Sequence, residues 1–595
     1  MSESPGPFEP SRRALVIDLL AAAALSAAFF IYYQFASTHL CGTDPYYHIK
    51  FAQLTRLQGP ILDFPWAQWS SWRDAFFDKE VLYHLYLSLF TWGDLMTGAK
   101  VANVVLGTAI FTVFMLVLRL NGVRWAWLWW VLLISSGGYF LFRMNVTRPQ
   151  VFSVLILLLG LHFLINERHW IVGLVSLLYS LSYTGHYQYV GLALGYVGVI
   201  YLMERRLPWK IFVWALCGMV LGWIVHPNFP NNVSGFFLQN VLVIANQWAP
   251  KVNLNMGGEL NPMTTRSMLG VNTATLVPLW LAFTYGLIKR PPVSSKTAFL
   301  FAASTLYLIL TLFTKRFAEY WIPVTLLFCA FFFSPLVSGW EPVKKIYRFF
   351  AERTLIGCVV AAVLFPLTLV WLAVVALRGG PARAARFAAV ARAGGVLFLV
   401  GLVVILGVTF IRSHFDSFKQ VNRCGDTTYG PSARFVRDEI PAGKQVMTCD
   451  WDDAPYVFYY SHKHYYTVFL DPNFMYVWRP DVWHRWDRLT HAKDQDPLHT
   501  LRNFFKADYV YCTSDFGAFR SQLTRQADAE QVYPPSRVRD QYQDCRRQGD
   551  CLMCSTTSDC PKGAICKHPG AINRPTRSKP KRCEPDPHVF IFRVK

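Results

Sequence analysis

The sequence predicts a polytopic α-helical membrane protein that ends in a small α/β domain on the outer side of the membrane. Hydrophobic residues make up 53% of the 595 residues and charged residues only 16%. The apolar residues form long uninterrupted runs, and a run of about 17 to 25 residues crosses a bilayer as a helix, because only a helix satisfies every backbone polar group there. After residue 412 the sequence changes to alternating short helix and strand patterns.

The hydrophobic runs predict about 11 to 13 membrane spans. They cover residues 14–36, 100–118, 125–142, 150–166, 169–183, 187–203, 211–226, 271–288, 297–313, 317–338, 355–377 and 394–411. Basic loops flank residues 355–377 on both sides, and Pro366 lies near their middle, so a re-entrant hairpin or a surface helix is the alternative there. No small-residue cleavage site follows the first run, which is therefore interpreted as a retained anchor.

The formal net charge of +21 is distributed in a way that predicts topology. Lys and Arg gather in alternate short loops, which the positive-inside rule places in the cytoplasm. We therefore expect a multi-pass protein of the bacterial inner (plasma) membrane, with a cytoplasmic N-terminus and an extracytoplasmic C-terminal domain. Membrane lipids are the expected partners of the basic loops. Nucleic acid is not expected, because no basic patch with interleaved aromatic residues lies on a soluble segment.

The cysteines are concentrated in the C-terminal part of the chain. Four lie in the first 420 residues and nine lie between Cys424 and Cys583. Six of them fall in a polar, loop-rich stretch that contains a single Cys-x-x-Cys pair, Cys551 and Cys554. Disulfides are favoured over a zinc site, for which two such pairs would be typical. Disulfides persist in an oxidising compartment, which again places this part outside the cytoplasm.

These patterns divide the chain into five parts. They are a cytoplasmic N-terminus (1–13), a transmembrane domain (14–411) with outer loops at 37–98 and 227–270, an extracytoplasmic α/β domain (412–540), a disulfide-rich insertion (541–587) and a closing strand (588–595). Within the α/β domain we expect strands at 445–449, 465–470, 508–512 and 588–594, and helices at 433–439, 455–460 and 498–506. Functional residues are expected where such strands end.

The sharpest motif surrounds Asp44, in the segment GTDPYYHIK (residues 42–50) that follows the first span. This segment resembles the first acidic motif of the oligosaccharyltransferase catalytic subunits, which are C-type membrane glycosyltransferases. The resemblance implies that Asp44 is a catalytic group and a ligand of a divalent cation, Mg²⁺ or Mn²⁺. From the residues alone the alternative is an aspartate that caps the helix beginning at Pro45.

The next motif in the order of the family is incomplete. Arg143 matches an arginine that precedes the second acidic motif, but the segment RMNVTRPQ (residues 143–150) contains no carboxylate. Gln150, Asn145 or a histidine such as His48 then serves as a ligand, or the cation is held more weakly, or no cation is used.

Two further outer segments continue the resemblance. Glu259 lies where the family keeps a glutamate that reaches the site, and is a candidate catalytic residue and metal ligand. Arg143 and Arg148, with Lys315 and Arg316 before the tenth span, are candidates for binding the donor phosphate. Basic residues on the outer face contradict the positive-inside bias, and a lipid-linked pyrophosphate would explain them, with snorkelling to lipid headgroups as the alternative.

The acceptor motif is also altered. The family carries Trp-Trp-Asp-Tyr-Gly after a short strand, and this chain has VMTCDWDDAP at residues 446–455. Trp451 and Asp452 match the family pattern, and with Asp453 they are the candidate acceptor-binding residues. The first Trp and the Tyr-Gly pair are missing, which leaves the identity of the acceptor open.

The resemblance implies an inverting glycosyltransferase that moves a glycan from a polyprenyl-(pyro)phosphate carrier to an extracytoplasmic protein, lipid or glycan. Because of the altered motifs, a second hypothesis within the same fold stays open, the transfer of a single sugar from polyprenyl phosphate. A transporter or flippase of lipid-linked sugar is a third hypothesis. It would predict polar residues at mid-membrane and an inverted repeat, and the sequence shows neither.

Overall fold

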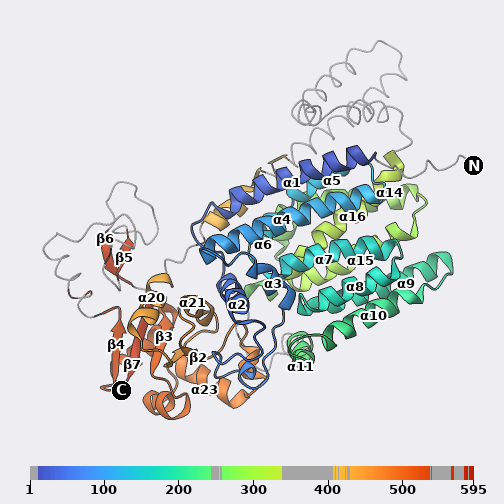
Figure 1. Ribbon diagram of the computed structural model, residues 1–595. Helices are drawn as coiled ribbons and strands as arrows, with labels where there is room; N and C mark the ends of the chain where they lie inside the picture. The colour runs from blue at the N-terminus through green and yellow to red at the C-terminus, as the bar shows by residue number, and fades with distance from the viewer. Residues whose placement is uncertain are drawn as a thin grey trace, which may run out of the picture.

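A computed structural model of the chain shows a helical bundle beside a smaller α/β domain (Figure 1). It describes residues 11–242, 254, 257–337, 407–408, 411–412, 414–422, 424, 429–535, 538, 540, 560, 564–567, 582–586 and 588–595. The predicted segments 355–377 and, for the most part, 394–411 and the disulfide-rich insertion lie outside these residues. The C-terminus lies in the α/β domain.

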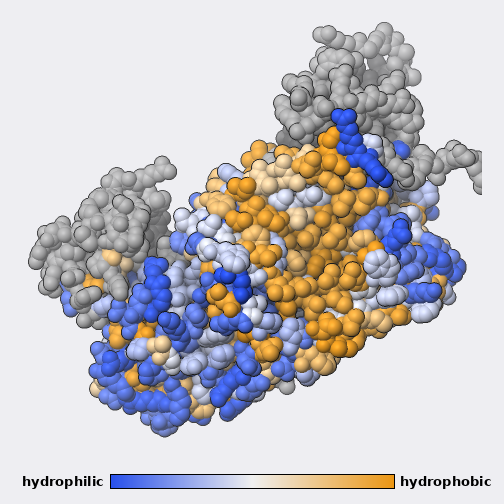
Figure 2. Space-filling model, viewed as in Figure 1, coloured by the Kyte–Doolittle hydropathy of each residue, from blue (hydrophilic) through white to orange (hydrophobic). Residues whose placement is uncertain are grey.

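The bundle is built from the predicted apolar runs. Its helices are α1 (Arg12–Gln34), α4 (Leu95–Leu120), α5 (Ala126–Ile134), α6 (Gly138–Met144), α7 (Pro149–Ile165), α8 (His169–Ser180), α9 (Tyr187–Glu204), α10 (Trp209–Ile224), α14 (Thr273–Lys289), α15 (Ser295–Phe313) and α16 (Ala318–Val337). A broad apolar surface crosses the bundle, whereas the α/β domain is mostly hydrophilic (Figure 2). This contrast is what a membrane-embedded bundle with an attached aqueous domain requires.

Fewer helices can span a membrane than the sequence predicts. Among the described residues, four are long and apolar enough, namely α1, α4, α15 and the helix that includes α16, or five if a bent pair counts as one span. The bent pair is α6 and α7, which meet at 101°. The predicted spans 125–142 and 150–166 are thus α5, α6 and α7. Hydropathy detects the polar interruption between residues 142 and 150, where the two predicted spans part, but it does not give the angle between the helices.

The bend places an arginine at the start of α7. Pro149 is the first residue of this helix, where its missing N–H breaks no hydrogen bond, and Arg148 precedes it with extended backbone. Met144 ends α6 only four residues earlier. The two helix ends therefore meet in one short loop that carries Arg143 and Arg148 on its two sides.

The α/β domain contains a five-stranded sheet with the order β2-β1-β3-β7-β4. The strands are β1 (Gln445–Thr448), β2 (Tyr465–Tyr466), β3 (Tyr509–Thr513), β4 (Ala529–Tyr533) and β7 (Val589–Val594). The two pairings of β1 are parallel, and β7 runs antiparallel between β3 and β4. The four predicted strands are present, and the closing strand joins the sheet as expected. The strand predicted at 465–470 is shorter, and a strand at 529–533 was not predicted.

The predicted helices of this domain are α20 (Gly430–Glu439), α21 (Asp453–Tyr460) and, at 498–506, the short α24 (Pro497–His499) followed by a π turn. A longer helix, α23 (Pro480–Thr490), was not predicted. Its two Trp side chains, Trp483 and Trp486, pack into the domain core.

The outer loop 37–98 binds the domain to the bundle. It contains α2 (Asp44–Gln58) and α3 (Val81–Ser88), which lie between the two parts (Figure 1). Ala67 bridges to Tyr466 of the edge strand β2, and Phe64 and Trp72 share a buried core with the domain. A disulfide joins Cys41, just before α2, to Cys424, just before the domain. The loop is therefore an integral part of the domain interface.

Candidate active site

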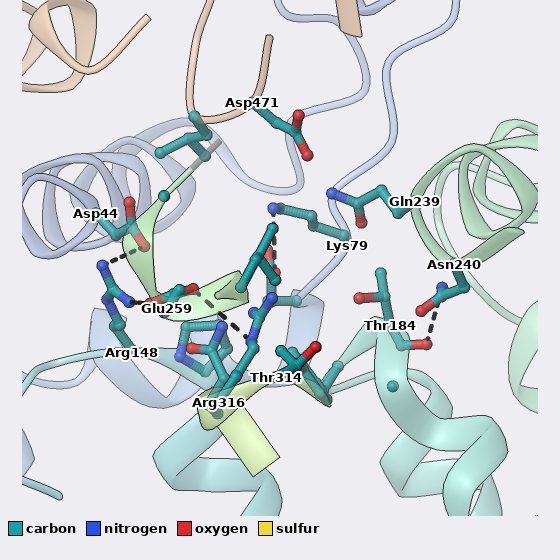
Figure 3. A pocket seen from close by; sticks show the side chains of 18 of the residues that line it. Asp44, Lys79, Arg148, Thr184, Gln239, Asn240, Glu259, Thr314, Arg316 and Asp471 are labelled. Atoms are coloured by element: carbon teal, nitrogen blue, oxygen red, sulfur yellow. Dashed lines mark hydrogen bonds and ion pairs between the residues drawn. The ribbon is translucent and has the colours of Figure 1, made fainter. Parts of the chain in front are cut away.

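A cavity of about 410 Å³ lies where the bundle, the outer loop and the α/β domain meet. Its wall contains residues from α2, the segment before α3, the start of α7, the 3₁₀ turn Gly258–Leu260, the segment before α16, and the loop after β1. Figure 3 shows that charged side chains from these separate elements converge on it. Segments more than 400 residues apart in the sequence thus build one polar site.

Asp44 is the first residue of α2, and its side chain lines this cavity. Thr43 precedes the helix, and no side-chain cap is formed there, so the capping role is not what occupies the carboxylate. Instead, Asp44 Oδ2 lies 3.1 Å from Arg148 Nη2. Pro45 at the second helical position is compatible with the start of the helix. The helix therefore presents Asp44 to an arginine across the cavity wall.

Glu259 is surrounded by three guanidinium groups. Its Oε2 accepts hydrogen bonds of 2.5 Å from both Arg143 Nη1 and Arg148 Nη1, and its Oε1 lies 3.8 Å from Arg316 Nε. Arg143 also donates to the buried Glu319. Burial alone would raise the pKa of Glu259, but these arginines hold the pKa well below its usual range. Glu259 is therefore a stably ionised anchor of the arginine cluster.

Three nitrogens of the arginine cluster have no hydrogen-bond partner in the described part of the chain, and two of the three arginines, Arg148 and Arg316, belong to the cavity wall. Arg143 Nη2, Arg148 Nε and Arg316 Nε are buried and have no hydrogen-bond partner among the described residues. A buried donor without a partner is unfavourable by about 1 to 3 kcal/mol, more for a charged group. A phosphate oxygen is an acceptor that guanidinium groups bind well. The cluster is thus suited to an anionic ligand.

Asp452 brings a second carboxylate to the same cavity from the domain side. Its Oδ1 accepts a hydrogen bond of 3.1 Å from Thr43 Oγ1, and Thr43 is the residue directly before Asp44. Burial, followed by the negative charges of Asp44 and Asp450, raises the pKa of Asp452 to about 7. A carboxyl group with a pKa near 7 can accept and return a proton at neutral pH.

The structure brings most of the predicted residues together, and separates three of them. Trp451 lines the cavity beside Asp452. Arg143 lies behind the wall and reaches the site through Glu259. Lys315 lines a neighbouring, smaller pocket, and Asp453 is fully buried inside the domain, where it accepts a hydrogen bond from the Asp450 backbone.

Several lining residues were not predicted from the sequence. Lys79, Glu80 and Asp471 carry charge into the cavity, and Tyr183 and Tyr187 add aromatic rings. Lys79 and Glu80 follow Asp78 directly, and three consecutive charged residues before the apolar segment 81–90 are a sequence signal that could have identified them.

A divalent cation does not fit between Asp44 and Glu259 as these residues stand. Arg148 bridges the two carboxylates, with one Nη on each, so a cation would have to displace this guanidinium. His48, the third predicted ligand, lies one helical turn from Asp44 and is grouped with Glu80 and His84 instead. Among the described residues, these last three form the group with metal-ligand geometry.

No protein-family model matches the chain, and no curated protein sequence is detectably similar to it. Solved structures are similar. The oligosaccharyltransferase of Archaeoglobus fulgidus in its apo form has a TM-score of 0.57 and 13% identity, covering 85% of this chain and 71% of that one. The archaeal oligosaccharyltransferase AglB from Archaeoglobus fulgidus, in complex with an inhibitory peptide and a dolichol-phosphate, has a TM-score of 0.56 and 12% identity over 84% and 70%.

The mycobacterial arabinofuranosyltransferase AftD has a TM-score of 0.50 and 13% identity, covering 98% of this chain and 40% of that one. The names of all of these describe glycosyltransferases. The chain therefore shares the fold of these glycosyltransferases, including the oligosaccharyltransferase fold that the resemblance implies.

Proposed function

We propose that this protein transfers a glycan from a polyprenyl-(pyro)phosphate carrier to an acceptor on the extracytoplasmic side of the membrane. The observation that carries the proposal is the pairing of Asp44 with Arg148 in a cavity whose wall also contains Arg316 and Lys79. This pairing lies where the membrane bundle meets an aqueous domain, so a lipid-anchored donor and a soluble acceptor can both reach it. The fold shared with oligosaccharyltransferases supports the same reaction class.

Arg148 and Arg316 would bind the phosphate of the donor, with Lys79 as a third cation in the cavity wall. Both side chains belong to the cavity wall, and guanidinium groups bind phosphate oxygens well. The dolichol-phosphate complex of the similar archaeal enzyme supports a polyprenyl carrier. As the bond between the sugar and the phosphate breaks, negative charge accumulates on the leaving phosphate. Guanidinium groups held in fixed positions in the cavity wall would stabilise that charge.

Asp44 and Asp452 would act on the acceptor. The acceptor nucleophile bonds to the anomeric carbon, the phosphate leaves with the electron pair of the old bond, and the acceptor proton passes to a carboxylate. Attack from the face opposite the phosphate inverts the configuration of that carbon. Asp44 would orient the nucleophile, and Asp452, with its pKa near 7, can take the proton. No step here is assigned to a cation.

The disulfides support an extracytoplasmic site. One joins Cys41 to Cys424, and a second joins Cys449 to Cys512 in neighbouring strands of the domain. Such bonds persist in oxidising compartments. Together with the basic loops, this supports a bacterial inner-membrane protein whose N-terminus is cytoplasmic.

A single-sugar transferase is the second candidate. Trp451 and Asp452 are the part of the acceptor motif that remains, and the cavity of about 410 Å³ lies toward the small end of the usual ligand-pocket range of about 300 to 1,000 Å³. Such a cavity suits one sugar and its phosphate.

The test is glycosyl transfer by the full-length protein in lipid vesicles. Radiolabelled polyprenyl-phosphate monosaccharides and polyprenyl-pyrophosphate oligosaccharides are offered separately, so that the active donor distinguishes the two candidates. Asp44→Asn keeps the side-chain shape and removes the charge, and we expect transfer to fall by about 10²- to 10⁴-fold. Asp481→Asn, on an exposed surface pair, is the matched control. Undiminished transfer by Asp44→Asn, or no transfer from any donor, would contradict the proposal.

A further inference from the structure

Three potential metal ligands lie close together beside the cavity, one helical turn along α2 from Asp44. They are His48 of α2, Glu80 directly before α3, and His84 of α3. Each offers a ligand atom, and these atoms lie within 4.8 Å of one another. All three side chains are buried, with 3%, 2% and 0% of their surface exposed. Glu80 and His84 are four residues apart, so they occupy the same face of one helical turn.

The hydrogen bonds of His84 fix which of its nitrogens faces the group. Its Nδ1 lies 2.8 Å and 2.9 Å from the two carboxylate oxygens of Asp78, which can only accept, so this nitrogen carries the proton. The lone pair is then on Nε2, which lies 2.8 Å from His48 Nδ1. A carboxylate behind a histidine is the usual outer partner of a metal-binding imidazole. The Glu80 backbone N–H donates to Asp78 and holds it in place.

The buried carboxylate of Glu80 is a second feature that indicates a bound ion. Its Oε2 is buried and has no hydrogen-bond partner among the described residues, while Lys79 Nζ lies 3.7 Å from the other oxygen. A buried carboxylate oxygen without a donor is rare, because it loses its water without compensation. A metal ion is one partner that would satisfy it. His48 Nδ1 donates its proton to His84 Nε2, and a metal ion would take the place of that proton.

We propose that His48, Glu80 and His84 bind a divalent transition-metal ion of the Zn²⁺ type, at a site separate from the carboxylates of Asp44 and Glu259. Two imidazoles and one carboxylate suit Zn²⁺, whereas Mg²⁺ and Mn²⁺ prefer oxygen ligands. Three protein ligands leave a coordination position open. His48 and Glu80 also belong to the cavity wall, so the ion would lie next to the cavity.

The ion would also fix the helix that carries Asp44. His48 lies four residues after Asp44 on α2, and α2 packs against α3. A metal bond from His48 to the two ligands of the α3 segment would tie these elements together. The site would therefore position Asp44 without contacting it. The inference rests on the ligand group alone and does not depend on the proposed glycosyl transfer.

The experiment measures metal binding by the full-length protein in detergent after removal of metal with a chelator. Zn²⁺ is titrated calorimetrically, bound metal is counted by mass spectrometry, and X-ray absorption of the Zn²⁺ protein gives the ligand atoms. We expect one ion per chain, with a shell of nitrogen and oxygen that includes imidazole. Glu80→Gln and His84→Asn should weaken binding by more than 100-fold. Asp78→Asn should weaken it by about 10- to 100-fold, as for other outer partners.

The matched control is His491→Gln, an exposed histidine paired with Asp487, which should bind Zn²⁺ as the unaltered protein does. Gel filtration and thermal unfolding check that each variant is folded. Two results would overturn the proposal. One is the absence of a stoichiometric ion, or unchanged affinity in folded Glu80→Gln and His84→Asn. The other is a shell containing sulfur, which would assign the ion to cysteines. The ligand shell of the unaltered protein decides the question even if a variant does not fold.

Discussion

Arg148 connects the two carboxylates that the sequence motifs single out. One of its terminal nitrogens lies 3.1 Å from Asp44 and the other 2.5 Å from Glu259. A guanidinium group can make both contacts because its N–H groups form a rigid planar fork, which a lysine lacks. The positive charge between these carboxylates is thus provided by the chain itself. Arg148 also belongs to the cavity wall, so its positive charge would act on a donor phosphate there while it holds Asp44.

The raised pKa of Asp452 predicts how the stability of the protein depends on pH. Its pKa of about 7 in the folded state exceeds the value of about 3.9 in an unfolded chain, so the folded protein holds a proton that the unfolded chain has lost. The stability that Asp452 contributes is present below about pH 4 and is lost as pH rises through 7. Asp452→Asn removes this loss, and the thermal midpoint of the variant minus that of the unaltered protein should increase between pH 5 and 8.

Thermal unfolding in one detergent at pH 5, 6, 7 and 8 measures this difference. Asp481→Asn is the control, because 62% of its side chain is exposed and it pairs with Arg479, so its difference should stay flat over the same range. A flat difference for Asp452→Asn would show that Asp452 does not titrate near neutral pH.

At the scale of elements, the sequence predicts those that depend on local pattern. The apolar runs locate α1, α4, α15 and α16, and turn residues around β1 locate its strand. The break between α6 and α7 is visible in the hydropathy of the sequence, but their angle of 101° is not. The β2 strand is shorter than predicted, with two residues paired to β1.

The residues of the candidate site were likewise predicted only where they belong to a local sequence motif. Asp44, Glu259 and Arg316 are found from their motifs, and the fold brings them into one cavity. Glu80 and His84 belong to no motif, and their approach to His48 depends on how α3 packs against α2. Their spacing of four residues is visible in the sequence, but it acquires meaning only from that packing.

The hydrogen bonds between the outer loop and the edge of the sheet can be tested by substitution. The backbone N–H of Gln68 donates to the carbonyl of Tyr466 at 3.0 Å, and that of Trp69 donates to Thr467 at 3.0 Å. The outer loop thus extends the sheet beyond β2. Gln68→Pro removes one donor and leaves a buried carbonyl short of a partner, which should destabilise the interface by about 1 to 3 kcal/mol. Limited proteolysis should then cut the outer loop faster.

Gln68→Ala is the matched variant, because it keeps the backbone N–H and loses only a side-chain bond to the Pro65 carbonyl. Its rate of cleavage should stay close to that of the unaltered protein. Equal cleavage of the Pro and Ala variants would show that this loop does not depend on the sheet.

At the scale of the whole molecule, the disulfide between Cys41 and Cys424 constrains the topology. Its two cysteines must lie on the same side of the membrane, so the chain crosses an even number of times between them. Eleven of the predicted spans lie in that interval, which is odd. At least one predicted segment therefore does not cross on its own. Residues 355–377 are the segment for which the sequence itself offers a non-spanning alternative.

The same disulfide should stabilise the contact between the two parts of the protein. It joins two cysteines that are 383 residues apart in the sequence, and Cys41 lies three residues before Asp44. Long loops lose the most chain entropy on closure, and removing a native disulfide typically lowers stability by about 2 to 5 kcal/mol. The double variant Cys41→Ser, Cys424→Ser should therefore unfold at a lower temperature. It should also lose glycosyl transfer more steeply on heating, because the domain that carries Asp452 separates from the bundle that carries Arg148.

Thermal unfolding with and without reductant measures this contribution. Reductant should lower the midpoint of the unaltered protein by more than that of the double variant, and the excess is the contribution of this one bond, because Cys449–Cys512 is common to both. Cys217→Ser, which removes an exposed free thiol, is the control and should behave as the unaltered protein does. If reductant lowers both midpoints equally, the outer loop and the domain are held together by their shared aromatic core and the sheet edge, without a contribution from the covalent link.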